Sequence, residues 1–359
     1  MTADRLQAEG FRNYQALDIA FAPGLNVIYG QNGQGKTNLL EAVYLFCTGK
    51  SYRTVHDTEA ILFGESHARV RLEFSAAKRS NTAEIRLGDK KEVRLNGAPV
   101  GRLSELVGAF HAVLFTPEHL GLIRGGPAAR RQFLDVFISQ WKPVYFQTLL
   151  KYYQVVRQRN SLLRRRPANL PEQLAVWNEK LFEYGSVVCD GRESALLRLS
   201  DAVHASALDI TGGLEEFTLS YLPSVRGDYR DKERFLAQLD RAFDQEVEKG
   251  VSLIGPHRDD FIVKLNGRDL KKYGSQGQVR TSVLALKLAE CEMIYQYCGE
   301  YPVLLLDDIL SELDGGRQEY LLSHIGGRQV LLTHAGMDTR LDAADAVFEV
   351  AAAQIRKGG

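Results

Sequence analysis

A glycine-rich segment, Gly30-Gln-Asn-Gly-Gln-Gly-Lys36-Thr37, carries the clearest chemical pattern in the chain. Two glycines separated by four residues and followed by Lys and Thr form the P-loop pattern, in which backbone N–H groups surround the phosphates of a nucleotide. Lys36 is expected to reach the β and γ phosphates, and the Thr37 hydroxyl is expected to bind Mg²⁺. The sequence therefore predicts a nucleotide and Mg²⁺ site formed by Gly30, Asn32, Gly33, Gly35, Lys36, Thr37 and Asn38.

The segments on either side of this loop must position it. Residues 24–29 read as a short buried strand, and the apolar residues of 38–47 recur at helical spacing. Glycines in the loop allow successive N–H groups to converge at the start of the helix, where the helix dipole favours anions. A glycine turn that matches by accident is the alternative, and the flanking strand and helix argue against it.

A second apolar strand is predicted at 301–306 and ends in two acids, Asp307 and Asp308. Beside the P-loop strand, Asp307 would hold Mg²⁺ through its water shell, and Asp308 would orient or deprotonate the attacking water. This is the Walker B arrangement, and it makes hydrolysis possible. The alternative is a buried strand followed by an acidic helix start, which the P-loop disfavours.

Another predicted helix begins at Ser275-Gln-Gly277-Gln278. Ser, any residue, Gly and Gln at a helix start form the pattern of the ABC signature, and such a helix N-terminus can bind phosphate. In this class of ATPase the signature reaches the ATP held by a second copy, so ATP would join two copies. A simple helix cap is the alternative, but the motif gains weight because it precedes the Walker B strand by a single helix.

Three further positions complete the pattern. Asp314 and His334 fall where the D-loop and the switch histidine of such ATPases fall, although alone they would be a helix residue and a loop histidine. Arg12 and Asn13 are expected in a loop near the phosphate site, and a solvated hairpin tip is an equal alternative. Five motifs in order support an ATPase whose catalytic residues are Asp308, Lys36 and His334 and whose second nucleotide-binding surface is formed by Ser275, Gly277, Gln278 and Asp314.

The remaining pattern predicts an α/β fold. Residues 127–208 carry apolar residues at helical spacing, whereas strand patterns lie on both sides of them, at 5–14, 16–21, 24–29, 67–100, 113–115, 217–221, 261–265, 303–306 and 329–333. We therefore expect an ABC-type head with a mixed core sheet and an antiparallel β subdomain. Its predicted parts are 1–118 and 209–359, with a helical arm inserted at 119–208.

The first two predicted arm helices, 128–141 and 144–166, are basic on one side. Such charges usually mark a solvated helix face. The density of arginine toward 164–166 supports binding to a phosphate backbone equally well. The candidate DNA contacts are Arg130, Arg131, Arg157, Arg164, Arg165 and Arg166.

Composition limits the other possibilities. In 359 residues, 45 Lys and Arg balance 45 Asp and Glu, so nucleic-acid binding must come from a local patch. The N-terminal residues have no apolar run typical of a signal peptide, and no segment is long enough to cross a bilayer, so a cytoplasmic protein is expected. The four cysteines form no C-x-x-C pair, which favours reduced core thiols over disulfides or a metal site.

Together these motifs resemble the ABC-type ATPases of the structural-maintenance-of-chromosomes group, and within it the DNA-repair members. Other segments that carry the resemblance are 11–14, 51–53, 115–118, 126–131, 255–260 and 306–314. The resemblance implies an ABC head with a short helical arm in place of a long coiled coil. It also implies ATP-dependent dimerisation, DNA binding, and work with RecR and RecO to load recombinase at gapped or stalled DNA.

Two positions depart from the wider ABC pattern. Asp308 stands where transporters carry Glu, and its shorter side chain predicts slow turnover, with ATP acting as a clamp signal. The usual Q-loop glutamine is absent from 115–118, where either Glu118 or Thr116 replaces it. The alternative function, the ATPase subunit of a membrane transporter, is disfavoured by both departures and by the helical insertion. A P-loop kinase or GTPase is disfavoured because no Asn-Lys-x-Asp motif occurs.

Overall fold

The computed structural model describes residues 1–54, 56–336 and 343–358. The chain divides into two compact units, which we call the head unit (1–120 and 280–359) and the arm unit (121–279). The first boundary lies close to the predicted one at 118. The second differs from the predicted arm end at 208, because β9 (Phe217–Leu222) packs against the long helix α5 (Leu170–Thr211) and keeps residues 209–279 with the helices.

The core of the head unit is a mixed six-stranded sheet, in the order β15-β14-β3-β13-β12-β8. Neighbouring strands are parallel except for the terminal pair β14 and β15. The central strands are buried on both faces, which explains why they read as continuous apolar runs. The bounds are β3 Leu25–Tyr29, β8 Ala112–Phe115, β12 Val303–Asp307, β13 Val330–His334, β14 Ala346–Ala351 and β15 Gln354–Lys357.

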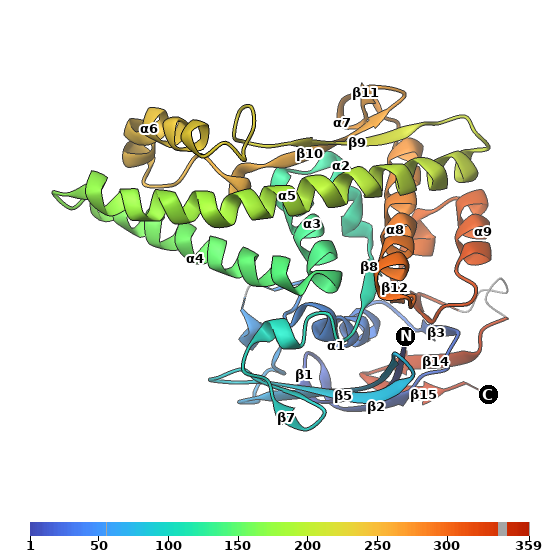
Figure 1. Cartoon of the computed structure of the whole chain (residues 1–359). Coiled ribbons are helices and arrows are strands. Elements are labelled where there is room, and N and C mark those ends of the chain that lie inside the picture. Colours follow the sequence, from blue (N-terminus) through green and yellow to red (C-terminus); the bar gives the residue numbers. More distant parts are fainter. Residues whose placement is uncertain (55, 337–342, 359) are drawn as a thin grey trace. The chain divides into compact units, whose positions relative to one another are not determined.

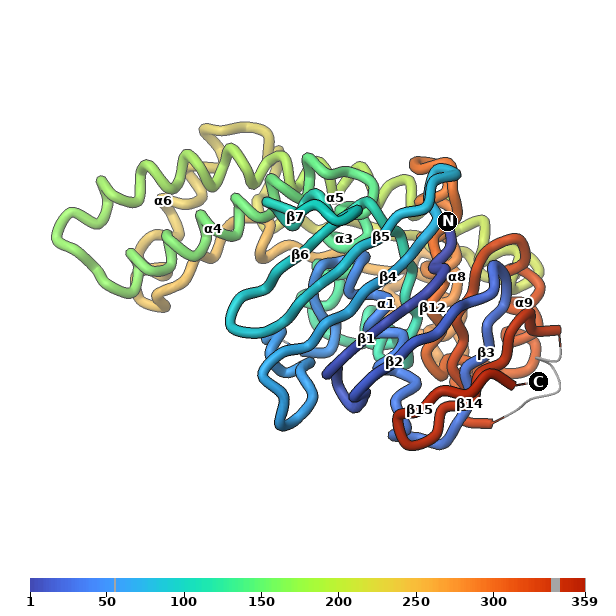
Figure 2. Tube along the Cα trace, turned by 90° about the horizontal axis from the view of Figure 1, so that it is seen from below, coloured from blue at the N-terminus to red at the C-terminus, as the bar shows by residue number. Residues whose placement is uncertain are grey.

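An antiparallel sheet forms the second layer of the head unit, and Figure 2 shows its strands side by side. Its order is β2-β1-β4-β5-β6-β7, with bounds β1 Thr2–Phe11, β2 Tyr14–Ala20, β4 Ala68–Ala76, β5 Arg79–Leu87, β6 Glu92–Leu95 and β7 Ala98–Pro99. Alternate residues such as Val70, Leu72 and Phe74 are buried, as the period of two predicts. The mixed core and antiparallel subdomain are confirmed.

Helix α1 (Lys36–Thr48) contacts strands of both sheets. Ten of its residues are buried, which fits a helix enclosed on nearly all sides. Helix α8 (Gln276–Cys298) is also buried along most of its length, and the division between the two units falls within it. The head unit further contains α9 (Gly315–His324) and the 3-10 turns Asp57–Ala60, Leu103–Glu105, Pro117–Leu120 and Ile309–Glu312.

The arm unit is built around α3 (Pro127–Trp141), α4 (Pro143–Arg165) and α5, as the sequence predicts. Proline begins α3 and α4, where its missing N–H costs nothing. Figure 1 shows α4 running beside α5. The other elements are α2 Gly121–Arg124, α6 Lys232–Lys249, η4 Pro256–Arg258, α7 Leu270–Tyr273 and a sheet of β9, β10 (Asp260–Leu265) and β11 (Arg268–Asp269). No helix of the described residues is both long and apolar enough to span a membrane.

Candidate nucleotide site

Four parallel strands of the core sheet end at one edge and bring the predicted motifs together. The register pairs their last residues across the sheet: Tyr29 with His334, Thr333 with Asp307, and Leu306 with Phe115. The P-loop follows β3, Asp308 follows β12, and residues 116–118 follow β8. This edge therefore assembles the P-loop, the two acids and His334, as expected for a ligand site at the carboxyl ends of parallel strands.

The backbone of the P-loop requires glycine at its last position. Gly35 has φ of 122°, and a Cβ there would lie 2.8 Å from the Tyr14 hydroxyl. That hydroxyl donates to the Gly35 carbonyl at 3.1 Å, and Asn13 Nδ2 donates to the Gln34 carbonyl at 3.0 Å. The turn between β1 and β2 thus holds the loop from one side. Gly33 has no atom within 4 Å of its would-be Cβ, so the loop is open there.

Lys36 and the start of α1 are suited to bind phosphate. Lys36 Nζ donates to the Gly30 carbonyl at 2.5 Å and to the Gln31 carbonyl at 3.0 Å, so the ammonium group lies against the loop. Burial lowers the pKa of Lys36, and the charges of Asp308 and Asp307 oppose that shift. No side chain caps α1, which leaves N–H groups of its first turn for an anion.

Thr37 and Asp307 form the part of the site that fits Mg²⁺. Thr37 Oγ1 donates to Asp307 Oδ1 at 3.0 Å, and Thr333 Oγ1 donates to the same oxygen at 2.8 Å. Asp307 is only 6% exposed, and burial raises its pKa, with smaller contributions from the charges of Glu118 and Asp308. A hydroxyl beside a buried carboxylate supplies the hard oxygen ligands that Mg²⁺ prefers. These residues would hold the cation.

Asp308 and His334 lie beside this pair. Asp308 has φ of 50°, and its N–H donates to Thr333 Oγ1 at 2.9 Å, which fixes the backbone in a left-handed conformation. His334 Nδ1 lies 2.7 Å from the Gly336 carbonyl, which can only accept, so Nδ1 carries the proton. The longer contact from the Gly336 N–H, 3.3 Å, would need the other tautomer, and the shorter contact is the better hydrogen bond. In this tautomer Nε2 is an acceptor.

The structure separates the two residues that the sequence left open for the Q-loop. Thr116 is buried, and its hydroxyl lies 3.1 Å from His119 Nδ1, so it bonds within its own turn. Glu118 is exposed, and its charge contributes to the raised pKa of Asp307. Because the Thr116 hydroxyl is already engaged within its own turn, Glu118 is the better candidate.

The signature and D-loop residues cap their own helices in the single chain. Ser275 Oγ accepts from the Gln278 N–H at 3.2 Å while Gln278 Oε1 accepts from the Ser275 N–H at 2.9 Å, a reciprocal capping box at the start of α8. Ser275 is nevertheless exposed, and Gly277 follows it in the first turn. Asp314 accepts from the Arg317 N–H at the start of α9 and also pairs with the Arg317 guanidinium.

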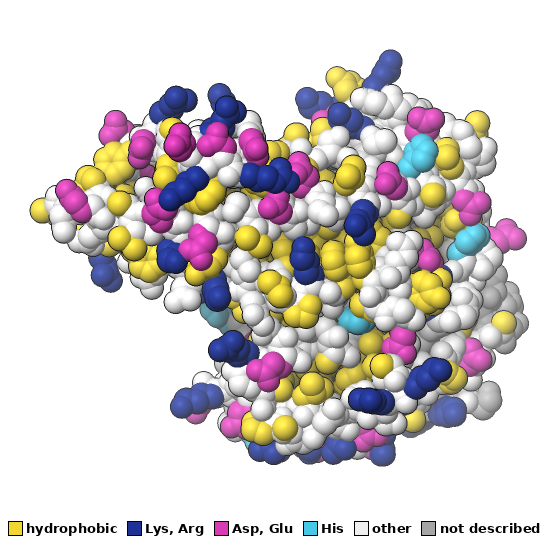
Figure 3. Space-filling model, in the orientation of Figure 1, with side chains coloured by type: hydrophobic (Ala, Val, Ile, Leu, Met, Phe, Trp, Pro, Cys, Tyr) yellow, Lys and Arg dark blue, Asp and Glu magenta, His cyan; other side chains and the backbone are white. Residues whose placement is uncertain are grey.

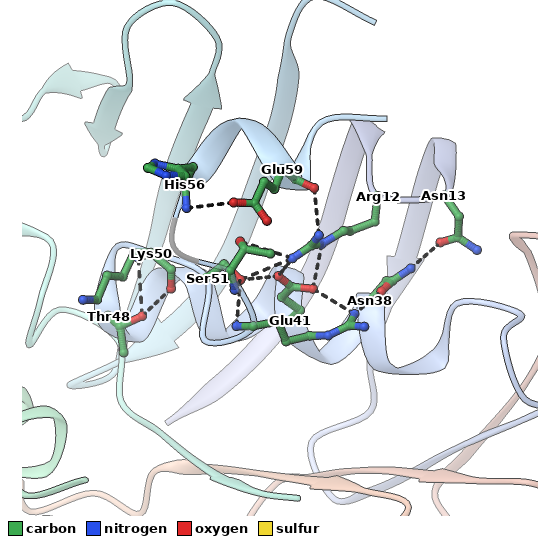
Figure 4. Close-up of polar contacts among 11 residues, drawn as sticks. Arg12, Asn13, Asn38, Glu41, Thr48, Lys50, Ser51, His56 and Glu59 are labelled. Carbon is green, nitrogen blue, oxygen red and sulfur yellow. Dashed lines mark hydrogen bonds and ion pairs between the residues drawn. The ribbon is translucent and has the colours of Figure 1, made fainter. Parts of the chain in front are cut away.

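Arg12 and Asn13 were both predicted to lie near the phosphate site. Asn13 bonds to the P-loop backbone, whereas Arg12 bonds to Glu41 of α1. Its guanidinium makes two hydrogen bonds to Glu41, at 2.9 and 2.5 Å, and a third to the Glu59 carbonyl at 2.8 Å. Figure 4 shows Arg12 and Glu41 facing each other, with Asn38 bonded to Asn13 nearby. Sequence reasoning missed Glu41, and the only signal was an acid within an otherwise apolar helix face.

Three of the six arginines predicted to bind DNA are engaged inside the arm unit. Arg130 is 5% exposed and pairs with Asp260 at 2.6 and 2.8 Å. Arg131 donates to the Asp259 carbonyl at 2.7 Å, and Arg166 donates to the Val247 carbonyl at 2.6 Å. The pairing of Arg130 with Asp260 neutralises its charge within the arm unit, which argues against a DNA contact at this residue. Among these six arginines, Arg157, Arg164 and Arg165 are exposed and have no such bond to a described residue.

This mixed sheet with its P-loop and Walker B acids defines an ABC-type P-loop ATPase head. The model of the RecF/RecN/SMC N terminal domain family matches residues 2–354. The chain belongs to this family, and within it to the RecF proteins.

Individual comparisons agree over nearly the whole chain. It is 42% identical over 344 residues to the DNA replication and repair protein RecF of Acetivibrio thermocellus, which covers 93% of each chain. It is 39% identical over 339 residues to RecF of Clostridium acetobutylicum, covering 94% of this chain and 93% of that protein. A solved structure of the recombination mediator protein RecF-ATPrS in the RecFOR pathway is similar with a TM-score of 0.92 and 33% identity, covering 100% and 98% of the two chains. A solved SmcHead bound to the C-winged helix domain of ScpA, at 14% identity and a TM-score of 0.57, shares the fold.

Proposed function

We propose that this chain is an ATP-dependent DNA-binding protein of recombinational repair. ATP binding joins two heads around DNA at gaps, and slow, DNA-stimulated hydrolysis releases them. The observation that carries the proposal is the Thr37 hydroxyl lying 3.0 Å from the buried Asp307 carboxylate beside the P-loop. The relatives named DNA replication and repair protein RecF, and one solved as RecF-ATP in the RecFOR pathway, support the biological setting.

In this proposal each functional residue at the carboxyl edge of the core sheet has a defined role. The P-loop N–H groups and Lys36 would bind the phosphates. Thr37 and Asp307 would hold Mg²⁺, which would neutralise negative charge on the phosphates. Asp308 positions the attacking water, and His334 Nε2 can accept a hydrogen bond from it. The side chain of Asp308 is one methylene shorter than Glu, so water is held less well and turnover is slow. Slow turnover fits a role for ATP as a conformational switch, because the ATP-bound state persists when hydrolysis is slow.

Dimerisation follows from the signature and D-loop residues. Ser275 and Asp314 are exposed at the starts of α8 and α9, where helix N-termini favour anions. The phosphates of the ATP bound to a second copy would contact Ser275 and Gly277. The site shared by the two copies would therefore be complete only when ATP is bound. RecR and RecO are the proposed partners in recombinase loading, by analogy with the RecFOR pathway named for the solved relative. A repair role of this kind places the protein in the cytoplasm.

DNA would bind to exposed cations of α4. This helix contains no Asp or Glu, and Arg157, Arg164 and Arg165 are exposed on it. Over α5 and α6, by contrast, basic and acidic side chains are interspersed in Figure 3, and ion pairs such as Lys232 with Glu179 neutralise them. Contacts to the phosphate backbone release counterions, so affinity should fall steeply with salt and should carry little sequence preference.

Light scattering with and without Mg-ATP tests the proposal. Wild type should dimerise only with nucleotide, and Lys36→Ala should lose both nucleotide binding and dimerisation. Ser275→Arg should bind ATP normally but remain monomeric, because the added side chain fills the space for the second copy's phosphates. Ser80→Arg, at an exposed serine of β5, is the matched control and should behave as wild type. A dimer that forms equally well without ATP would contradict the proposal.

A further inference from the structure

Glu41 is fully buried in α1, and its carboxylate is shared by two arginines. Oε2 accepts from Arg12 Nε at 2.9 Å and from Arg53 Nη1 at 3.3 Å. Oε1 accepts from Arg12 Nη2 and from Ser51 Oγ, both at 2.5 Å. Four donors occupy the four lone-pair positions of the carboxylate. Figure 4 shows how the side chains converge on Glu41 from the β1–β2 turn and from the segment after α1.

This cluster holds one more positive charge than negative charge. Arg12 is 14% exposed and Arg53 is 42% exposed, so the excess charge lies on the outer side, at Arg53. Arg53 Nη1 also donates to Asn38 Oδ1 at 2.6 Å. Asn38 directly follows Thr37 in the first turn of α1. The excess cation is therefore fixed beside the end of the helix that receives phosphate.

The same cluster shapes the turn that carries Tyr52. Ser51 Oγ donates to Glu41 and accepts from the N–H groups of Arg53 and Thr54 at 3.0 and 3.2 Å. Glu41 thus holds the turn through Ser51. The Tyr52 ring packs edge-on against Tyr44, with centroids 5.6 Å apart.

The Tyr52 hydroxyl is buried and makes no hydrogen bond to any described residue. Tyr52 directly precedes Arg53, whose guanidinium is bonded to Asn38 in the first turn of α1, so the segment that carries the hydroxyl lies beside the phosphate-binding end of that helix. Burial raises the pKa of Tyr52, and the charges of Asp307, Glu41 and Glu118 raise it further. A buried donor without a partner is costly in a protein. When the site is occupied, a phosphate oxygen of the nucleotide or a water on the metal would supply the missing acceptor.

We propose that Glu41 is a positioning residue of the nucleotide site. It fixes the segment 51–53 so that the Tyr52 hydroxyl donates to the phosphate and metal edge and the Arg53 cation stays beside it. Glu41 itself touches neither nucleotide nor metal. The inference rests on the proposed function, because it assigns a role at the same ATP site. A purely structural ion pair would explain the burial of Glu41, but it would not explain the unpartnered Tyr52 hydroxyl.

Two variants test this role. Glu41→Gln keeps the shape of the side chain but has one acceptor oxygen, whereas the four donors need two. The Gln side chain would therefore no longer hold the Arg53 guanidinium in place. Tyr52→Phe removes only a hydroxyl without a partner, so its fold should be at least as stable as wild type. In both variants we expect the single-turnover hydrolysis rate to fall at least about tenfold while the ATP dissociation constant changes less than about threefold, the pattern of a lost transition-state interaction.

The control is Glu65→Gln, which alters an exposed acid that accepts from Gln15 and does not contact Arg12 or Arg53. It should retain wild-type binding and turnover. Thermal melts report whether the Glu41→Gln variant folds. If that variant does not fold, the Tyr52→Phe variant tests the inference instead. Wild-type turnover in Tyr52→Phe would overturn the inference while leaving the proposed function intact. Failure of the wild-type protein to bind or hydrolyse ATP would overturn the proposed function, and the inference with it.

Discussion

Replacing Glu246 by Gln should destabilise the protein by about 3 kcal/mol, because it leaves the Arg159 guanidinium buried without a counter-charge. The two side chains are 1% and 0% exposed, and Arg159 Nη2 lies 2.6 Å from Glu246 Oε2. Arg159 also donates to Asn178 Oδ1 and Ser252 Oγ, each at 2.9 Å. Breaking a buried pair typically costs about 3–5 kcal/mol, and the lower end applies here because Gln retains an oxygen.

Replacing Arg159, the other member of this ion pair, should destabilise the protein by a similar amount. Arg159→Met leaves the Glu246 carboxylate buried, with only the Leu253 N–H, 2.6 Å from Oε1, to stabilise it. The double variant Arg159→Met, Glu246→Gln removes both charges of this pair, and Gln Oε1 can still accept from the Leu253 N–H. Its remaining cost is the lost partners of Asn178 and Ser252, about 1–2 kcal/mol. The double variant should therefore be more stable than either single variant.

Urea unfolding of the four proteins measures this coupling directly. If the losses of the two single variants simply add in the double variant, the reasoning is refuted. DNA binding by the double variant is a second readout, since a neutral buried pair contributes nothing to counterion release. Its salt dependence should match wild type. A reduced slope would show that Arg159 reaches DNA after all.

Two further predictions concern the function. Reversing Arg164 and Arg165 to Glu should weaken DNA binding and lower the slope of log affinity against log salt by roughly 2 or more, about 0.9 for each lost phosphate contact; unchanged salt titrations would remove α4 from the DNA surface. Asp307→Asn should leave the nucleotide-free protein at least as stable as wild type in thermal melts, because burial raises the pKa of this carboxyl and disfavours its charged form, yet it should lose the stabilisation by Mg-ATP. In wild type that Mg-dependent stabilisation needs the charged carboxylate, so it should fade as the pH drops through the raised pKa, at a higher pH than an ordinary Asp would give; equal stabilisation of Asp307→Asn would contradict the metal assignment.

The candidate nucleotide site at the carboxyl edge of the core sheet was predictable. Its motifs are local in the sequence, and the way parallel strands bring such motifs together is general. A glycine loop after one buried strand and two acids after another can be found by inspection, and parallel strand ends meet at the same edge whatever the strand order. The predicted strand at 303–306 is observed as β12, Val303–Asp307. The helix α6 and the C-terminal pair of β14 and β15 were not predicted.

Interactions between distant segments were not predictable in the same way. The hydrogen bond of Thr333 to Asp307 depends on the register of β12 against β13, which no local pattern sets. Arg12 pairs with Glu41, and spacing in the sequence cannot tell which acid its guanidinium meets. The boundary at 208 was wrong for a related reason. A strand pattern at 217–221 gives no sign of which unit it joins, and packing on α5 decides it.

Charge around the nucleotide edge is divided in a way that suits Mg-ATP. The charges of Glu118 and Asp308 act on Asp307, and the charges of both aspartates act on Lys36, so acids predominate where Mg²⁺ would bind. The Glu41 cluster carries one excess positive charge beside Asn38 in the first turn of α1. A divalent cation relieves the first imbalance and a phosphate group relieves the second. Neither free Mg²⁺ nor free nucleotide relieves both imbalances, so we expect the site to bind Mg²⁺ and nucleotide together more tightly than either alone.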